Sequence, residues 1–175
     1  MSAPAPTIRV AVRAETFDVA AETAAITGGS RRIGAVVSFL GLCRDEAGSL
    51  RALEIEHFPG MAEDELRRIA ADAAARWHLH AMTIIHRHGT IPVGDPIVLV
   101  LAASTHREAA FHAAQFVMDF LKTDAPFWKK ELPADGSQSR WVAAHTKDDA
   151  RRQQWTEGAA EGITFGRDKG RASEA

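Results

Sequence analysis

An amphipathic helical pattern from Glu63 to Trp77 is the feature that most restricts the fold of this chain. Apolar residues recur in it at spacings of three and four, and acidic residues gather at its start, as is typical of a helix N-terminus. Strand-like runs stand on either side, at Leu50–Phe58 and at Met82–His88. The Met82–His88 run and a further run at Pro96–Ala103 are candidates for neighbouring strands. The middle of the chain therefore predicts a helix set among strands.

The remaining segments continue this irregular mixture of strands and helices. Gly28-Gly29 is a plausible helix end, and Ser104 and Thr105 are available as caps for the last helix. The further predicted elements are strands at Ile8–Val12 and Ile33–Leu42 and helices at Phe17–Thr27 and His106–Leu121. We expect the Ile33–Leu42 strand to be buried. Because the chain has no internal repeat and no glycine-rich phosphate loop, the pattern predicts an α+β fold.

Length and composition allow one folded domain with polar ends. At 175 residues and 46% hydrophobic content, the chain is long enough to bury one core and too short for two. We expect a disordered N-terminal stub at residues 1–6, a single domain at residues 7–150, and a polar, flexible C-terminal tail at residues 151–175.

The charge balance and the lack of targeting segments restrict location and partners. Lysine and arginine total 21 against 23 acidic residues, a net charge of -2, which gives no general attraction to nucleic acid or to an anionic membrane. The first residues lack the pattern of a secretion signal, and no apolar run approaches the ~18 residues that a membrane span needs. We therefore expect a soluble, cytoplasmic protein whose single cysteine, Cys43, forms no internal disulfide.

Basic residues stand at four places that suit an anion site. They are Arg44, the His106-Arg107 pair, Lys122, and the Lys129-Lys130 pair. His106 and Arg107 lie at a predicted helix N-terminus, where backbone amides already give a positive potential, so a bound anion would explain them. Pairing with Glu108 or simple hydration would explain them equally, and the spacing leaves both interpretations open.

Lys122 and Lys129 enclose a turn that contains large aromatic residues. If the aromatics anchor this turn, the two ammonium groups converge and lower each other's pKa, which suits proton transfer or nucleophilic chemistry. Solvated surface charge is the alternative interpretation. His106 lies 16 residues before Lys122, roughly 24 Å along a helix at ~1.5 Å per residue. One small ligand would touch both only if a twofold dimer brought His106 and Arg107 of the partner subunit to the site.

The cysteine and the histidines have structural as well as functional interpretations. Cys43 beside Arg44 suits a persulfide carrier, but its place at the end of an apolar run is more typical of a buried side chain. His78-x-His80 and His86-x-His88 each place two imidazoles on one strand face, yet no third ligand follows at a telling spacing. We predict neither a metal nor a cofactor.

Four segments carry a specific combination of motifs. Ser104–Glu131, STHREAAFHAAQFVMDFLKTDAPFWKKE, holds the His-Arg pair and the order lysine, Ala-Pro-Phe-Trp, lysine. GAVVSFLGLCR from Gly34, LEIEHFPGM from Leu53 and IHRHGTIPVGD from Ile85 accompany it. Together the segments closely resemble the molybdopterin synthase large (catalytic) subunits. The resemblance covers residues from about 8 to 144. Phe58 departs from the family pattern, in which we expect tyrosine, so any hydroxyl contact there is lost.

The resemblance implies an α/β-hammerhead-like single domain with a mixed or antiparallel sheet and flanking helices. It implies a homodimer at the core of a heterotetramer, with a small ubiquitin-like sulfur-carrier subunit at each end. The implied activity is sulfur transfer from the thiocarboxylated C-terminal glycine of this carrier to cyclic pyranopterin monophosphate. The product is the molybdopterin dithiolene of molybdenum cofactor biosynthesis, and no cofactor on this chain is implied.

The resemblance also assigns a site residue by residue. Lys122 and Lys129 match the essential lysines of the family and are the predicted catalytic residues. The predicted substrate-binding residues are Leu42, Cys43, Arg44, His106, Arg107, Lys122, Lys129, Lys130 and Glu131.

Two other functions are compatible with parts of this pattern. A non-enzymatic module could dock a ubiquitin-like sulfur carrier without chemistry, but retention of both lysines counts against it. A different small-anion enzyme, such as an acyl or phosphoryl transferase, could use the same basic residues, but no nucleotide loop or nucleophile motif supports it. Carrier binding without turnover would favour the first, and turnover without a carrier would favour the second.

Overall fold

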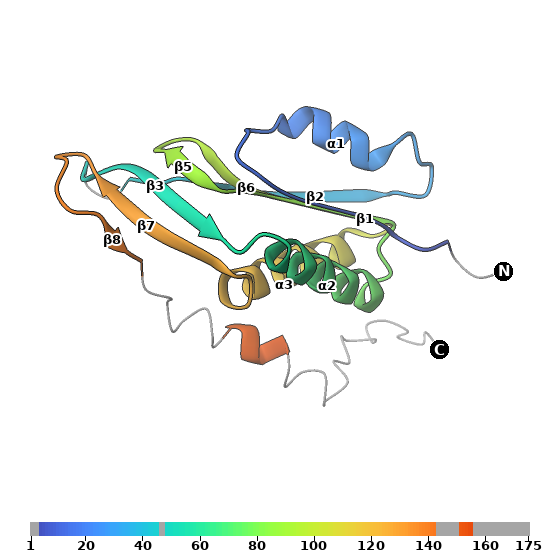
Figure 1. Ribbon diagram of the computed structural model, residues 1–175. Helices are drawn as coiled ribbons and strands as arrows, with labels where there is room; N and C mark the ends of the chain where they lie inside the picture. Colours follow the sequence, from blue (N-terminus) through green and yellow to red (C-terminus); the bar gives the residue numbers. More distant parts are fainter. Residues whose placement is uncertain (1–3, 46–47, 143–150, 156–175) are drawn as a thin grey trace, which may run out of the picture.

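The structure, a computed structural model, describes residues 4–45, 48–142 and 151–155 and consists of two β-sheets and flanking helices (Figure 1). The elements in chain order are β1 (Thr7–Arg13), α1 (Val19–Thr27), β2 (Ala35–Leu42), β3 (Leu50–His57), α2 (Met61–Arg76), β4 (Ala81–Arg87), β5 (Gly89–Pro92), β6 (Pro96–Ser104), α3 (Arg107–Thr123), β7 (Phe127–Pro133) and β8 (Arg140–Trp141). A helical turn follows at residues 151–155. The mixed α+β class predicted from the sequence is confirmed.

The first sheet carries the strand order β1-β4-β6-β2. β1 pairs with β4 in parallel, and the β4–β6 and β6–β2 pairs are antiparallel. The predicted neighbours are indeed adjacent, with Met82 opposite Ala102. Helix α1 covers one face of this sheet, and α2 and α3 lie side by side on the other (Figure 1).

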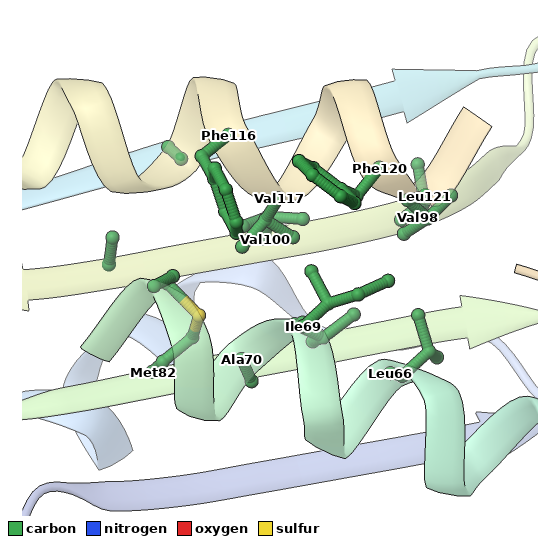
Figure 2. Close-up of a cluster of buried hydrophobic side chains, with 14 of the residues drawn as sticks. Leu66, Ile69, Ala70, Met82, Val98, Val100, Phe116, Val117, Phe120 and Leu121 are labelled. Carbon is green, nitrogen blue, oxygen red and sulfur yellow. The ribbon is translucent and has the colours of Figure 1, made fainter. Parts of the chain in front are cut away.

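The main core lies between the first sheet and the α2–α3 layer. Figure 2 shows Leu66 and Ile69 of α2 facing Phe116 and Val117 of α3, over strands β4 and β6. Burying each of these large apolar side chains stabilises the fold by about 1.5–3 kcal/mol. A smaller cluster on the α1 side consists of Phe17, Ile85, Leu99 and Leu101.

Local signals explain where the helices begin and end. Asp18 accepts hydrogen bonds from the backbone N–H groups of Ala20 and Ala21, which caps α1, and Gly28 closes that helix with a φ of 49°. At α2, the Glu63 side chain accepts a hydrogen bond of 2.7 Å from the Gly60 N–H. The expected caps of α3 are not used: its N-cap is His106, without a side-chain cap bond.

Ser104 and Thr105 are engaged elsewhere, which explains why they do not cap α3. Ser104 is the last residue of β6 and is buried. The Thr105 hydroxyl instead lies 2.8 Å from Nε2 of His80. Gly34 also approaches this corner so closely that an added Cβ would lie 2.3 Å from the Thr105 carbonyl oxygen. Only glycine fits there, so the start of β2 is packed tightly against the start of α3.

The second sheet has the order β5-β3-β7-β8, and all its pairs are antiparallel. Three of its four strands were not predicted. β7 contains the charged residues Lys129, Lys130 and Glu131, so its sequence lacks the apolar alternation that predicts a strand. It forms because it pairs along β3 from Leu50 to His57. This sheet extends beyond the end of the helical layer at which α3 finishes (Figure 1).

The strand predicted at Ile33–Leu42 forms at Ala35–Leu42, but the prediction that it is buried was wrong. β2 is an edge strand of the first sheet, and Ser38, Phe39 and Leu40 are exposed. Among the described strands only β6 pairs with it, and α3 covers it on one face, so an apolar run here does not become fully buried.

The ends of the chain are described in part. Five residues of the predicted C-terminal tail, 151–155, form a helical turn whose Trp155 packs on the core. Residues 1–3, 143–150 and 156–175, which include the predicted domain boundary, lie outside the described residues. None of the described helices is long and apolar enough to cross a membrane.

Candidate active site

Lys122 lies in the last turn of α3, where a cation is favoured by the negative end of the helix dipole. It lines an open cavity of about 630 Å³. The other lining residues are Val37, Ser38 and Phe39 of β2, Phe111, Ala114, Gln115, Met118 and Asp119 of α3, and Arg151 and Gln154 of the C-terminal turn. The cavity is therefore lined by apolar side chains and by the buried Asp119, and two exposed cations, Lys122 and Arg151, are among its lining residues.

The helical turn at residues 151–155 forms one wall of this cavity. Trp155 donates a hydrogen bond of 2.8 Å from Nε1 to Oδ2 of Asp119, and Arg152 pairs with Asp124 at 2.8 Å. The sequence analysis missed Arg151 and Gln154 as cavity residues. The available signal was Trp155, a large apolar residue at the end of an otherwise polar run.

Lys129 is the third residue of β7 and lies opposite Ile55 of β3. Since side chains alternate along a strand, Phe127, Lys129 and Glu131 share the face that contains the buried Ile55. Lys129 is correspondingly half-buried. An ammonium group in such a place is partly shielded from water, and its interactions with a bound anion are therefore stronger than at an open surface.

Aromatic and imidazole rings surround the start of β7. Phe127 stacks on His86 with a centroid separation of 3.8 Å and an interplanar angle of 16°, and His57 lies 6.2 Å from Phe127 and 4.4 Å from His88. Burial lowers the pKa of His86 to about 3, and the charge of Lys129 adds to this shift. Burial and the neighbouring His88 also lower the pKa of His57. The lowered pKa values keep His86 and His57 uncharged near neutral pH.

Leu42 is the last residue of β2, and Cys43 and Arg44 follow it. Leu42 is 51% exposed and Arg44 is also exposed, whereas Cys43 is 1% exposed. Burial raises the pKa of the Cys43 thiol, while a hydrogen bond from the Leu53 backbone opposes the shift. A buried protonated thiol is a poor nucleophile, which favours the structural interpretation of Cys43 over the persulfide interpretation.

Lys130 and Glu131 take opposite sides of β7. Lys130 alternates away from Lys129, reaches to 3.9 Å from Glu56 and lies 4.7 Å above the ring of Trp141. Glu131 shares the Lys129 face and lies opposite Leu53, the residue whose backbone bonds Cys43. Cys43 and Glu131 are thus each related to Leu53, the first by a backbone hydrogen bond and the second by strand pairing, whereas Lys130 lies on the other face of the sheet.

His106 and Arg107 lie at the opposite end of α3 from Lys122. The helix spans 17 residues, or roughly 25 Å at ~1.5 Å per residue. Both side chains are exposed. Within one chain, therefore, the structure does not bring them to Lys122.

In each histidine pair, one imidazole contacts a group that is not a histidine, cysteine or carboxylate. The His86 ring stacks on Phe127, and His80 contacts Thr105. Within residues 4–45, 48–142 and 151–155, no three His, Cys, Asp or Glu side chains are grouped so as to hold a metal ion.

Comparison with known proteins identifies the family. The family model described as MoaE protein matches residues 12–124. The molybdopterin synthase catalytic subunit of Mesorhizobium japonicum is 59% identical over 151 residues, which cover 86% of this chain and 94% of that protein. The chain belongs to the MoaE family. This confirms the resemblance found in the sequence and the predicted enzyme class, a molybdopterin synthase catalytic subunit.

Solved MoaE structures have the same fold. The Burkholderia ambifaria MoaE protein aligns with a TM-score of 0.74 and 43% identity, over 86% of this chain and 99% of that one. The molybdopterin synthase of Staphylococcus aureus aligns with a TM-score of 0.67 and 28% identity, over 75% of this chain and 95% of that one.

In this MoaE chain, the candidate residues form two groups. Lys122 and Lys129 lie on either side of the short α3–β7 connection, and the Leu42–Arg44 segment follows the end of β2 that pairs with the start of β6. His106 and Arg107 lie at the far end of α3. An anion held by members of both groups requires a second MoaE chain.

Proposed function

We propose that this chain transfers sulfur from the thiocarboxylated C-terminus of a small ubiquitin-like carrier subunit to cyclic pyranopterin monophosphate, forming the molybdopterin dithiolene. The observation that carries the proposal is the placement of Lys122. It lines an open cavity together with Arg151 and several apolar side chains, in a chain that belongs to the MoaE family. Such a cavity accepts an extended chain end and places its terminal anion beside an ammonium group.

The chemistry needs charge stabilisation and proton transfer but no cofactor. The thiocarboxylate sulfur attacks a side-chain carbon of the pterin and forms a C–S bond while the C–O bond at that carbon breaks and its oxygen takes up a proton, which leaves the carrier joined to the pterin as a thioester. Water then cleaves the acyl C–S bond, so the carrier departs as a carboxylate and the sulfur stays on the pterin. A second thiocarboxylated carrier repeats both steps at the neighbouring carbon and supplies the second sulfur of the dithiolene. Lys122 stabilises the negative charge that develops in both steps and transfers the protons, and Lys129 supports it.

Substrate recognition follows from the phosphate of the pterin. Arg44, together with His106 and Arg107 contributed by the partner subunit, holds this group, since guanidinium forks suit phosphate oxygens. Leu42, Cys43, Lys130 and Glu131 adjoin the site. The assembly is a homodimer with one carrier subunit at each end, and it works in the cytoplasm.

The test is single-turnover conversion of cyclic pyranopterin monophosphate by the chain and a thiocarboxylated small subunit. We expect the wild type to form the dithiolene, and Lys122→Ala to lose it by a factor of about 100 or more while it still binds the carrier. Arg67→Ala is the matched control, because Arg67 is an exposed cation on α2 whose guanidinium lies 2.8 Å from the carboxylate of Asp64.

Each outcome separates the functions considered above. Full activity of Lys122→Ala would remove this lysine from the chemistry. A folded wild type that binds the carrier but forms no product would make a docking module the better account. Product formed without any carrier would indicate a different small-anion enzyme.

A further inference from the structure

The stack of His86 on Phe127 joins the two sheets of the molecule. His86 belongs to β4 in the first sheet and is 1% exposed, while Phe127 is the first residue of β7 in the second sheet. Their rings are nearly parallel, at 16°, with centroids 3.8 Å apart. Lys129 follows two residues after Phe127 and projects from the same face of β7.

A second contact fixes the orientation of the His86 ring. Its Nδ1 lies 2.8 Å from the carbonyl oxygen of Arg87. Since a carbonyl oxygen only accepts, Nδ1 carries the proton and donates it, which assigns the tautomer. The imidazole is therefore held at its edge by the backbone of β4 and at its face by Phe127.

The charges around the ring favour its neutral form. The groups that act on it are Lys129 of β7, His57 of β3 and His88 after β4, and a positive charge on any of them disfavours protonation of the His86 ring. Burial has the largest effect and lowers the pKa of His86 to about 3. The ring is thus a neutral aromatic surface near neutral pH, and Lys129 is close enough to sense its charge.

We propose that His86 is a positioning residue for Lys129, because its stacking on Phe127 fixes the first residues of β7 and so the point at which the Lys129 side chain leaves the strand. The expected effect of His86 on turnover rests on the proposed sulfur transfer. Its expected effect on the reactivity of the Lys129 amine does not depend on that function, and it is measurable without any substrate.

Two variants separate the ring from the hydrogen bond. His86→Phe keeps a flat neutral ring against Phe127 but loses the bond to Arg87, whereas His86→Asn keeps a donor near the Nδ1 position but loses the ring. Ile85→Ala is the matched control, since Ile85 is the preceding residue of β4, is fully buried, and faces the other core cluster. Phe127→Leu removes the other ring of the stack and serves if His86→Asn does not fold.

The primary measurement is the acetylation rate of Lys129 in the folded protein, read by peptide mass spectrometry against a model lysine peptide in the same tube. We expect Lys129 to react about fivefold faster or more in His86→Asn and Phe127→Leu, because its strand loosens and the amine becomes more accessible. His86→Phe and Ile85→Ala should stay within about twofold of the wild type. Single-turnover rates should fall about tenfold in His86→Asn and be largely rescued in His86→Phe.

Three results would overturn the inference. The first is an acetylation rate of Lys129 in His86→Asn that equals the wild-type rate. The second is an equal change of this rate in His86→Phe and His86→Asn. The third is an increase in Ile85→Ala as large as that in His86→Asn. The two proposals can also fail separately. If the wild type forms no product but Lys129 is still acetylated faster in the variants that lose a ring of the stack, the proposed function is contradicted and the positioning role is supported.

Discussion

The indole Nε1 of Trp155 donates a hydrogen bond of 2.8 Å to the buried carboxylate of Asp119, a residue 36 positions earlier on α3. The Trp155 ring also meets Trp77 and Phe116 edge to face, at 5.6 and 5.5 Å between centroids. The C-terminal turn is thereby attached to both helices of the helical layer, beside the Lys122 cavity. A segment that is polar in sequence thus takes part in the site through one aromatic residue.

Trp155→Phe should destabilise the fold by about 1–3 kcal/mol, because it leaves the Asp119 carboxylate buried without its donor while most of the ring packing is kept. Urea unfolding followed by circular dichroism measures this change. Trp141→Phe is the control: Trp141 is 57% exposed, so its replacement should cost less than about 0.5 kcal/mol. Equal losses in the two variants would show that the bond to Asp119 contributes nothing specific.

The separation of Lys122 from His106 and Arg107 along α3 predicts active sites shared between two subunits. A Lys122→Ala chain and an Arg107→Ala chain should each be inactive alone. In a mixed dimer, however, one of the two sites combines an intact Lys122 from one chain with an intact Arg107 from the other. Mixing the chains one to one, with subunit exchange, should therefore restore about a quarter of the wild-type turnover.

The complementation experiment needs evidence that mixed dimers form. Differently tagged chains, purified through both tags, supply it and should raise the restored activity to about half of the wild type. If doubly tagged dimers stay inactive, Lys122 and Arg107 act within one chain, and the dimer arrangement of the site is wrong.

The sequence predicted elements with strong periodicity and missed those made by pairing. The α2 pattern placed its helix to within two residues, because an apolar stripe at helical spacing depends only on local order. β7 was missed, since Lys129 and Lys130 resemble a charged loop until β3 is known to lie beside them. The Lys122 cavity could not be predicted from the sequence for the same reason. Arg151 lies near α3 because Trp155 packs there, and no local sequence pattern indicates this tertiary contact.

Cys43 should react slowly with thiol reagents in the folded protein. Its side chain is buried, and burial raises the pKa of the thiol, so little thiolate is present near pH 8 and reagents have little access to it. We expect labelling by a disulfide reagent to be about 100-fold slower or more than in urea-unfolded chain. Intact-mass measurement after turnover should find no added sulfur on the chain, and a persulfide at Cys43 would contradict the structural interpretation.

The buried imidazole of His86 should make the fold sensitive to mild acid. Its pKa is lowered from 6.5 to about 3, so below pH 6.5 the unfolded chain binds a proton there that the folded chain does not. Stability from this group is present above the unfolded pKa and is lost as pH falls towards the folded pKa. Between about pH 6.5 and pH 5, the loss of folding stability is about 1.5 kcal/mol.

His86→Phe removes this pH-dependent contribution, whatever the stability of the variant at neutral pH. The contributions of the other histidines are the same in both proteins and cancel in the comparison. Urea unfolding at both pH values should therefore show the wild type losing about 1.5 kcal/mol more than the variant. Equal losses would mean that His86 is hydrated in the folded protein, and the stack on Phe127 would then be too loose to position β7.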